Sequence, residues 1–354
     1  MDIKQRDKDV LRAVRFEYPE AIPMHMSVSN ACWHHYPQDV LQALILEHPL
    51  LFPDYVERPL PIEPDYAPWR IAARRHTDSW ECVWETVEDG ITGAVVKPAL
   101  PTWTSFDAYQ PPDPAHHNGW TPIDWVGEAE RVRAARRAGR LSRGSLRHGH
   151  TFLTLSYMRG YEALLFDMAD EDPRLERLLE MVETFNLGLV ERYIDLGVDW
   201  MGYPEDLGMQ WGPMLSPAQF RKYIKPVYRR LMAPARAAGC VIHMHSDGDV
   251  RALAEDLLDC GVDVLNIQDL VNGVDWIADH LVGRVCIDLD IDRQNIVRFG
   301  TPEEIEAHIH EVVSRLGRPE GGLMLTHGLY PGVPLENAGT LMDAMERYTT
   351  YYTG

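Results

Sequence analysis

The strongest constraint on the fold is a regular alternation of short apolar runs and longer helical segments from about residue 146 onward. Apolar, β-rich runs stand at 148–157, 198–203, 240–245, 262–268, 284–290 and 321–328, and each precedes a segment with helical periodicity. Repeated β/α units predict a parallel sheet. This many units are compatible with a closed (β/α)8 barrel or with an open, doubly wound sheet.

The N-terminal third is less regular. Residues 21–28 predict a first strand, whereas residues 52–125 are rich in Pro, Trp and Tyr. Within this stretch, residues 80–100 predict a two-stranded ribbon that turns at Asp89 and Gly90. Because nothing here resembles a flexible linker, we interpret 52–125 as a covering insertion and predict a single domain over residues 1–354.

Composition narrows the class of protein. A chain of 354 residues can bury one large core, and its net charge of −20 argues against nucleic acid or an anionic membrane as partner. The chain shows no apolar run of about 18 residues and no secretory signal, which predicts a cytoplasmic location. Its five cysteines form no CxxC pair, so free thiols are expected.

Two histidines mark the end of the run at 240–245. His243 and His245 are two residues apart, so they project from the same side of a strand, and Ser246 and Asp247 follow at once. This position predicts the C-terminal rim of the sheet, where barrel enzymes assemble their active sites. Neutral imidazole is a common metal ligand, so the pair predicts a metal site. A pair of hydrogen-bonded core histidines is the alternative.

Other predicted strand ends carry polar side chains at the equivalent rim. Glu205 and Asp206 follow the run at 198–203, and His327 lies at the end of the run at 321–328. The run at 284–290 ends in an acidic stretch that includes Asp292. Convergence at one rim favours a shared site, whereas isolated acidic residues of this kind more commonly cap helices or face solvent.

Several blocks of the sequence resemble the uroporphyrinogen decarboxylase superfamily. The segment "LTHGLYPGVPLENAG" at 325–339 resembles the C-terminal signature of uroporphyrinogen decarboxylase itself. The blocks at 156–160, 205–231, 243–249 and 292–305 are similar to corresponding blocks of the wider superfamily, and the resemblance covers roughly residues 146–348. It implies an α/β fold, a single (β/α)8 TIM barrel, with an irregular N-terminal excursion.

The resemblance also distinguishes decarboxylation from the other reaction of the superfamily, methyl transfer. Uroporphyrinogen decarboxylases carry an arginine-bearing segment after the first strand, but the matching residues 22–40 here contain no arginine. Tyr157 and His327 match substrate-site positions of that enzyme, whereas Asp206 replaces its serine. A polyanionic tetrapyrrole would meet carboxylates in place of guanidinium groups, so its decarboxylation is disfavoured.

The second branch of the superfamily consists of cobalamin-dependent methyltransferases with a His-x-Cys zinc pair. By this resemblance His243 matches the first ligand, His245 replaces the cysteine and His327 takes the third position. A zinc ion held by three imidazoles acts as a Lewis acid on oxygen. The chain is therefore expected to be a zinc-dependent, corrinoid-linked methyltransferase for a small methylated compound, with an O-methyl donor favoured and cobalamin on a partner protein.

The remaining predicted roles follow from this reading. Glu205 or Asp206 would be a further ligand or a proton-transfer group, Asp247 would orient an imidazole or act as acid/base, and Tyr157 would be catalytic. Substrate-lining positions are expected at Met209, Trp211, Asp292 and Trp33.

Other assignments stay open. One is a decarboxylase of a small carboxylic acid or porphyrinogen-like compound, and another is a metal-dependent hydrolase. A third is a binding protein that keeps the barrel without catalysis. A small molecule and a corrinoid protein are the expected partners, nucleic acid and membrane are not expected, and a homodimer is compatible with the sequence.

Overall fold

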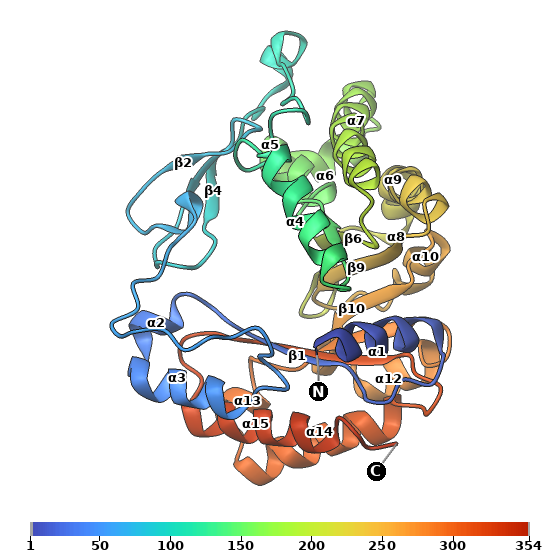
Figure 1. Ribbon diagram of the computed structural model, residues 1–354. Coiled ribbons are helices and arrows are strands. Elements are labelled where there is room, and N and C mark those ends of the chain that lie inside the picture. The colour runs from blue at the N-terminus through green and yellow to red at the C-terminus, as the bar shows by residue number, and fades with distance from the viewer. Residues whose placement is uncertain (1–2, 353–354) are drawn as a thin grey trace. The chain divides into compact units, whose positions relative to one another are not determined.

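The computed structural model describes residues 3–352, and the chain divides into two compact units (Figure 1). One unit joins Met1–Ala67 to Val264–Gly354, and the other is Pro68–Asp263. Both consist of parallel strands with helices packed on them, so the predicted β/α repeat is confirmed. The prediction of one domain over the whole chain stays a prediction.

The discontinuous unit contains four parallel strands in the order β1-β12-β11-β10, of which β1 (Met24–Val28) pairs with β12 (Leu323–Leu329). Strand β1 confirms the expected strand at 21–28. The other two strands are β10 (Val264–Gln268) and β11 (Cys286–Asp290). Every residue of β10 is buried, as expected for a strand that is covered on both faces.

Helices follow the strands of this unit as the sequence pattern predicts. The long α14 (Pro302–Leu316) begins at a capping box formed by Thr301 and Glu304, and it packs against α15 (Leu335–Tyr348). The two helices lie side by side in Figure 1. The remaining helices of the unit are α1 (Ile3–Arg15), α2 (Cys32–His35), α3 (Gln38–Glu47), α11 (Asp269–Asn272), α12 (Val274–His280) and α13 (Ile296–Phe299).

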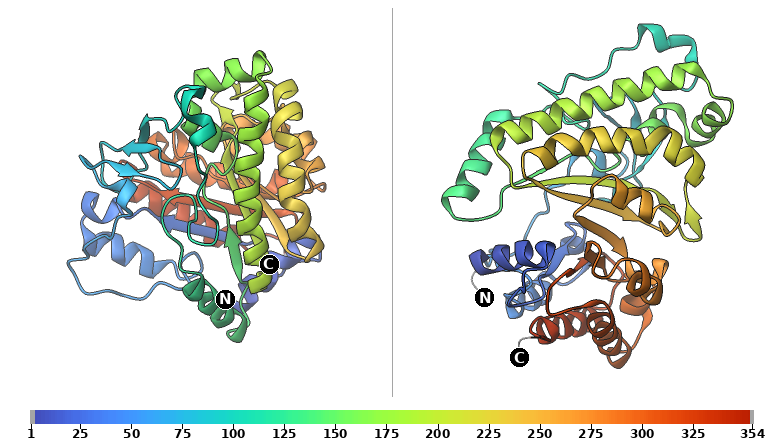
Figure 2. Two further views of the ribbon diagram at one scale, coloured as in Figure 1. Left: turned by 90° about the horizontal axis from the view of Figure 1, so that it is seen from above. Right: turned by 90° about the vertical axis from the view of Figure 1, so that its right-hand side faces the viewer.

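The continuous unit contains three parallel strands, β5 (Arg143–Ser145), β6 (Trp200–Asp206) and β9 (Val241–Asp247), in the order β9-β6-β5. The helices α7 (Pro173–Leu196) and α9 (Lys225–Ala237) run side by side along them (Figure 2). Its other elements are α4 (Trp125–Arg137), α5 (Phe152–Arg159), α6 (Tyr161–Ala169), β7 (Gly208–Met209), β8 (Gly212–Pro213), α8 (Pro217–Gln219), the π-helical turn Phe220–Ile224 and α10 (Ala254–Asp259).

The segment predicted as a covering insertion is irregular, as expected. It holds a small antiparallel sheet in which β3 (Val83–Glu85) lies between β2 (His76–Thr77) and β4 (Ala94–Lys97). Strands β3 and β4 form the predicted ribbon around Asp89 and Gly90, while β2 adds a third strand that the sequence did not indicate. Two 3₁₀ helices, Pro68–Arg70 and Trp103–Ala108, complete the segment.

One predicted strand is wrong. The run at 148–157 forms a turn and then helix α5, and the strand lies earlier, at β5. The reason is local, because the backbone N–H groups of Thr151, Phe152 and Leu153 are bound by a buried side chain of β6, which starts a helix at this point. Across residues 3–352 the parallel strands number seven, where the barrel prediction expects eight.

Two simpler expectations concern the cysteines and the membrane. All five cysteines are buried free thiols, as expected. Among the helices formed by residues 3–352, none has both the length and the apolar character that crossing a membrane requires.

Candidate active site

The candidate site lies at the carboxyl ends of β5, β6 and β9. The pairing register places Pro204 opposite His245 and Asp206 opposite Asp247, so polar side chains of β6 and β9 reach the same edge. His148 joins them from the turn that follows β5. Neighbouring parallel strands thus bring three segments together that are far apart in the sequence.

Three side chains at this edge form a compact cluster. One ligand atom from each of His148, Asp206 and His245 lies within 4.8 Å of the others. His148 Nε2 is 3.2 Å from Asp206 Oδ1, and His245 Nε2 is 3.6 Å from the same oxygen. Two imidazoles and a carboxylate are a ligand set of catalytic zinc sites, which keep an open fourth position. The donor types therefore fit a zinc ion.

The charge of Asp206 is set by its neighbours. Burial alone would raise its pKa, but the hydrogen bonds and electrostatic attraction of the neighbouring His148 and His245 outweigh burial and hold the pKa of Asp206 below the usual value. The backbone N–H of Asp247 also donates to Asp206 Oδ1, at 3.2 Å. Asp206 therefore stays ionised at the edge, in the form that binds a cation.

Close backbone contacts hold the ends of β6 and β9 together. Gly248 has φ +81°, and a Cβ there would lie 2.2 Å from the carbonyl carbon of Gly208, so only glycine fits this crossing. Ser246 Oγ accepts from the Leu207 backbone N–H at 2.9 Å and donates to the Asp247 carbonyl at 3.0 Å. The two glycines and the serine thus keep Asp206 and Asp247 next to each other.

Glu205 has a different environment from its neighbour in the chain. Its carboxyl group is fully buried and accepts hydrogen bonds from the backbone N–H groups of residues 151–153 and from the Tyr228 hydroxyl at 3.0 Å. Burial raises the pKa of Glu205 to about 7, against the lowering effect of these hydrogen bonds. Glu205 thus caps the N-terminus of α5, and the alternative reading of an acidic cap applies to it.

The two histidines of the "HGH" turn, His148 and His150, also lie in different environments. His148 reaches the cluster, whereas His150 is fully buried, with ring contacts to Tyr203 and Tyr228. Its Nδ1 lies 2.6 Å from Thr151 Oγ1, and burial lowers the pKa of His150 to about 3. His150 is thus a neutral core residue beneath the cluster.

The predicted metal ligands are only partly brought together. His245 belongs to the cluster, whereas His243, nearer the start of β9, is not among its three members and places its ring 5.3 Å from that of Trp200. His327 belongs to the other unit, where its Nδ1 lies 3.0 Å from the Ile291 carbonyl and burial lowers its pKa to about 4. Its role as a ligand stays a prediction.

The predicted catalytic residues Asp247 and Tyr157 lie in the same unit as the cluster. Asp247 Oδ1 is 3.8 Å from His245 Nε2, the same ring nitrogen that lies 3.6 Å from Asp206 Oδ1. Tyr157 lies in α5, with its ring 4.6 Å from that of Trp84, and burial raises its pKa. The roles given to both residues stay predictions.

The predicted substrate-lining residues have dissimilar positions. Met209 and Trp211 belong to the β7-β8 hairpin, where Trp211 is 95% exposed. In the other unit Asp292 accepts from the Asn295 and Ile296 backbone N–H groups, which makes it a helix cap. The buried Trp33 of that unit packs against Arg58. No ligand contact is shown for any of them, so their binding roles stay predictions.

The sequence reasoning missed His148. The signal was present, because "HGH" is a histidine-rich turn, but placing the strand at 148–157 put both of its histidines inside a strand. With the strand at β5, His148 takes the same rim position as the polar residues after β6 and β9.

Comparison with known proteins shows which protein family the chain belongs to. The family profile "Uroporphyrinogen decarboxylase (URO-D)" matches residues 85–348, which include the whole cluster. The chain belongs to the uroporphyrinogen decarboxylase family. Curated family members named uroporphyrinogen decarboxylase include one from Syntrophotalea carbinolica, 26% identical, and one from Gloeobacter violaceus, 28% identical. Each match covers about half of both chains, 49% and 52% of this chain and 52% of either relative.

One solved structure supports the fold over nearly the whole length of this family member. A methyltransferase from Methanosarcina mazei superposes with a TM-score of 0.68 at 15% identity, covering 97% of this chain and 98% of that protein. At this identity the likeness concerns the fold. The predicted α/β fold of the barrel class is confirmed.

Proposed function

We propose that this family member is a zinc-dependent methyltransferase that takes a methyl group from an oxygen of a small substrate and delivers it to a corrinoid on a separate protein. The observation that carries the proposal is the convergence of His148, Asp206 and His245 at the ends of three neighbouring strands. A cytoplasmic location and the corrinoid protein as partner belong to the same proposal.

The proposed ligands are the three members of the cluster. A zinc ion bound there would supply positive charge that stabilises negative charge developing on a substrate oxygen. Asp206 remains ionised because of its histidine neighbours, so it offers a charged oxygen ligand to the cation. Asp247, whose Oδ1 lies 3.8 Å from His245 Nε2, accepts or returns a proton at the substrate.

Three observations favour methyl transfer over tetrapyrrole decarboxylation. Residues 22–40 lack the arginines that a polycarboxylate substrate needs, and the cluster offers Asp206 where the decarboxylase has serine. One protein with a matching fold over nearly the whole chain is a methyltransferase. An acidic, metal-binding edge suits a small methyl ether better than a substrate with many carboxylates.

The metal site is tested by counting zinc in protein purified without chelators. We expect about one zinc per chain, and His245→Ala should lose most of it because an open three-ligand site tolerates little loss. His148→Ala should do the same. His243→Ala is the matched control on the same strand and should keep its zinc. The opposite pattern, with zinc kept in His148→Ala and lost in His243→Ala, would restore the ligand set predicted from the sequence.

The reaction is tested with the zinc-loaded protein, a reduced corrinoid protein and a panel of methoxylated aromatics. Methyl transfer converts the cob(I)alamin spectrum to that of methylcobalamin, and this change should depend on His148 and His245. No conversion across a broad panel with fully metallated protein would refute methyl transfer.

Decarboxylation of a small carboxylic acid is the second candidate. It is favoured by the names of the curated relatives, which are uroporphyrinogen decarboxylases. Release of carbon dioxide without any corrinoid would select this reaction, and we expect none from uroporphyrinogen.

A further inference from the structure

A second polar network lies in the continuous unit, around a buried arginine. Arg147 precedes His148 in the chain, and its side chain is 2% exposed. Its Nη1 donates to Asp78 Oδ2 at 3.2 Å and to the Gly119 carbonyl at 2.7 Å. The Trp120 ring lies 4.2 Å from the guanidinium carbon, so one face of the cation is covered by an indole.

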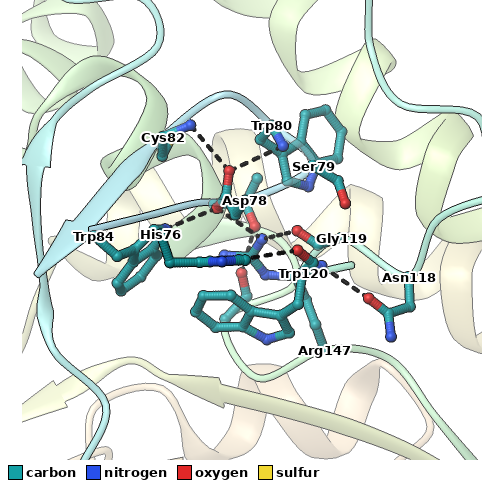
Figure 3. A network of polar contacts seen from close by, with 12 residues as sticks. His76, Asp78, Ser79, Trp80, Cys82, Trp84, Asn118, Gly119, Trp120 and Arg147 are labelled. Atoms are coloured by element: carbon teal, nitrogen blue, oxygen red, sulfur yellow. Dashed lines mark hydrogen bonds and ion pairs between the residues drawn. The ribbon is translucent and has the colours of Figure 1, made fainter. Parts of the chain in front are cut away.

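The acceptors of this network are already shared among several donors. Asp78 Oδ1 accepts from the Trp80 and Cys82 backbone N–H groups, each at 2.9 Å. Asp78 Oδ2 accepts from Trp84 Nε1 at 3.0 Å as well as from Arg147. Figure 3 shows these bonds converging on Asp78. One carboxylate thus serves four donors.

Three buried donors in the same network have no acceptor. They are Arg147 Nε, Arg147 Nη2 and the indole Nε1 of Trp80. A buried N–H group without a partner destabilises a fold, and the effect is larger for a charged group. The network therefore lacks acceptor atoms, and the deficit centres on the guanidinium.

The geometry of the unsatisfied atoms indicates what would fill the deficit. Nε and Nη2 form one edge of the planar guanidinium, and two parallel N–H groups at such an edge match the two oxygens of a carboxylate. The rings of Trp120 and Tyr157 lie 4.2 Å and 5.8 Å from the guanidinium carbon, and the Trp84 ring contacts both of them. These aromatic neighbours favour a ligand with an apolar body.

We propose that Arg147 binds the carboxylate of a small aromatic acid through its Nε and Nη2 edge. The inference deepens the proposed function by giving the substrate a carboxylate, and it rests on that function for the reaction but not for the binding. Asp78 holds the guanidinium in place through Nη1 and so leaves the other edge to the ligand.

Entry of the ligand requires local movement, because the two nitrogens are covered in this structure. Gly119 and Trp120 lie in the loop between Trp103–Ala108 and α4, outside any helix or strand. Gly119 has φ +98°, and a Cβ there would be 2.5 Å from Arg147 Cδ, so the loop packs directly on the arginine. Displacement of this loop would open a path to the arginine and change the surroundings of the Trp120 indole.

The test uses zinc-free protein, which separates this proposal from the metal site. Tryptophan fluorescence and calorimetry are recorded during titration with benzoate and with its neutral analogue benzamide. We expect benzoate to bind about 10- to 100-fold more tightly, the factor expected for a bidentate, charge-assisted contact. Arg147→Lys keeps the charge but loses the fork, and it should remove most of this preference.

Arg159 supplies a matched control. It is also buried, donates to Asp167 and to the Leu100 carbonyl, and lies 4.0 Å from the Trp103 ring. Arg159→Lys should keep the preference for benzoate. Equal affinity for benzoate and benzamide, or an equal loss in both lysine variants, would overturn the proposal. If the parent protein binds no zinc but still prefers benzoate to benzamide, the proposed metal site is refuted while the proposed carboxylate site is supported.

Discussion

Glu205 and Asp206 are consecutive carboxylates at the end of β6, yet they serve opposite sides of the strand. Glu205 turns into the protein, where it is fully buried and caps α5, while Asp206 turns to the open edge between two histidines. Burial raises the pKa of the first, and the histidines lower the pKa of the second. One residue stabilises the turn that carries His148, and the other shares a proposed metal ion with that histidine.

The largest expected effect comes from the open side of this pair. Asp206→Asn keeps the size of the side chain but removes the charge between the imidazoles, so zinc content should fall and kcat/KM of the metal-dependent reaction should drop by about 10³-fold. The unfolding free energy of the zinc-free protein should change by no more than about 1 kcal/mol, because the ion pairs are partly solvated. Denaturation of the variant at low urea with metal binding intact would contradict this assignment.

The buried side should give the reverse result. In Glu205→Gln the amide NH₂ group replaces one of the two oxygens that accept from the backbone N–H groups of residues 151–153, so at least one of these hydrogen bonds is lost. We expect a loss of about 2–3 kcal/mol in unfolding free energy at pH 5, measured by urea denaturation. The folded variant should keep its zinc. Tyr228→Phe removes one bond from the same carboxyl and should cost only about 1 kcal/mol.

The difference between Glu205 and Asp206 also shows how much of the fold and of the site could be predicted from the sequence. The β/α alternation predicted parallel strands, and polar residues after each strand predicted an active edge, because strand ends meet on one side of a parallel sheet. Which of two adjacent carboxylates faces inward depended on the start of α5, which the apolar run at 148–157 concealed. The position of His148 was missed for the same reason, since it depends on a cap contributed by another strand.

Arg147 was missed for a related reason. In the sequence it is a single arginine before a histidine-rich turn, with no pattern that indicates a binding role. Its partners Asp78 and Gly119 come from the irregular segment, where no hydrophobic periodicity indicates which residues are in contact. The strand pairing of β6 with β9 could be inferred from the repeat, but contacts between a repeat unit and an insertion depend on the tertiary packing of that insertion.

The pH dependence of stability tests both carboxylates at once. Glu205 has a folded pKa of about 7 against an ordinary value of 4.5, so between these values the folded chain holds a proton that the unfolded chain has lost. Stability should therefore fall as pH rises through this window, by an amount on the order of 3 kcal/mol, and then level off. Glu205→Gln should lack this fall, so its deficit relative to the parent protein should narrow toward zero by pH 8.

Asp206 has the opposite sign, because its folded pKa lies below the ordinary value of 3.8, and its contribution is present above that value and lost as pH falls below it. Urea titrations of zinc-free protein at a series of pH values measure both slopes, and a slope between pH 4.5 and 7 that survives in Glu205→Gln but disappears in Asp206→Asn would reverse the assignment of the two residues.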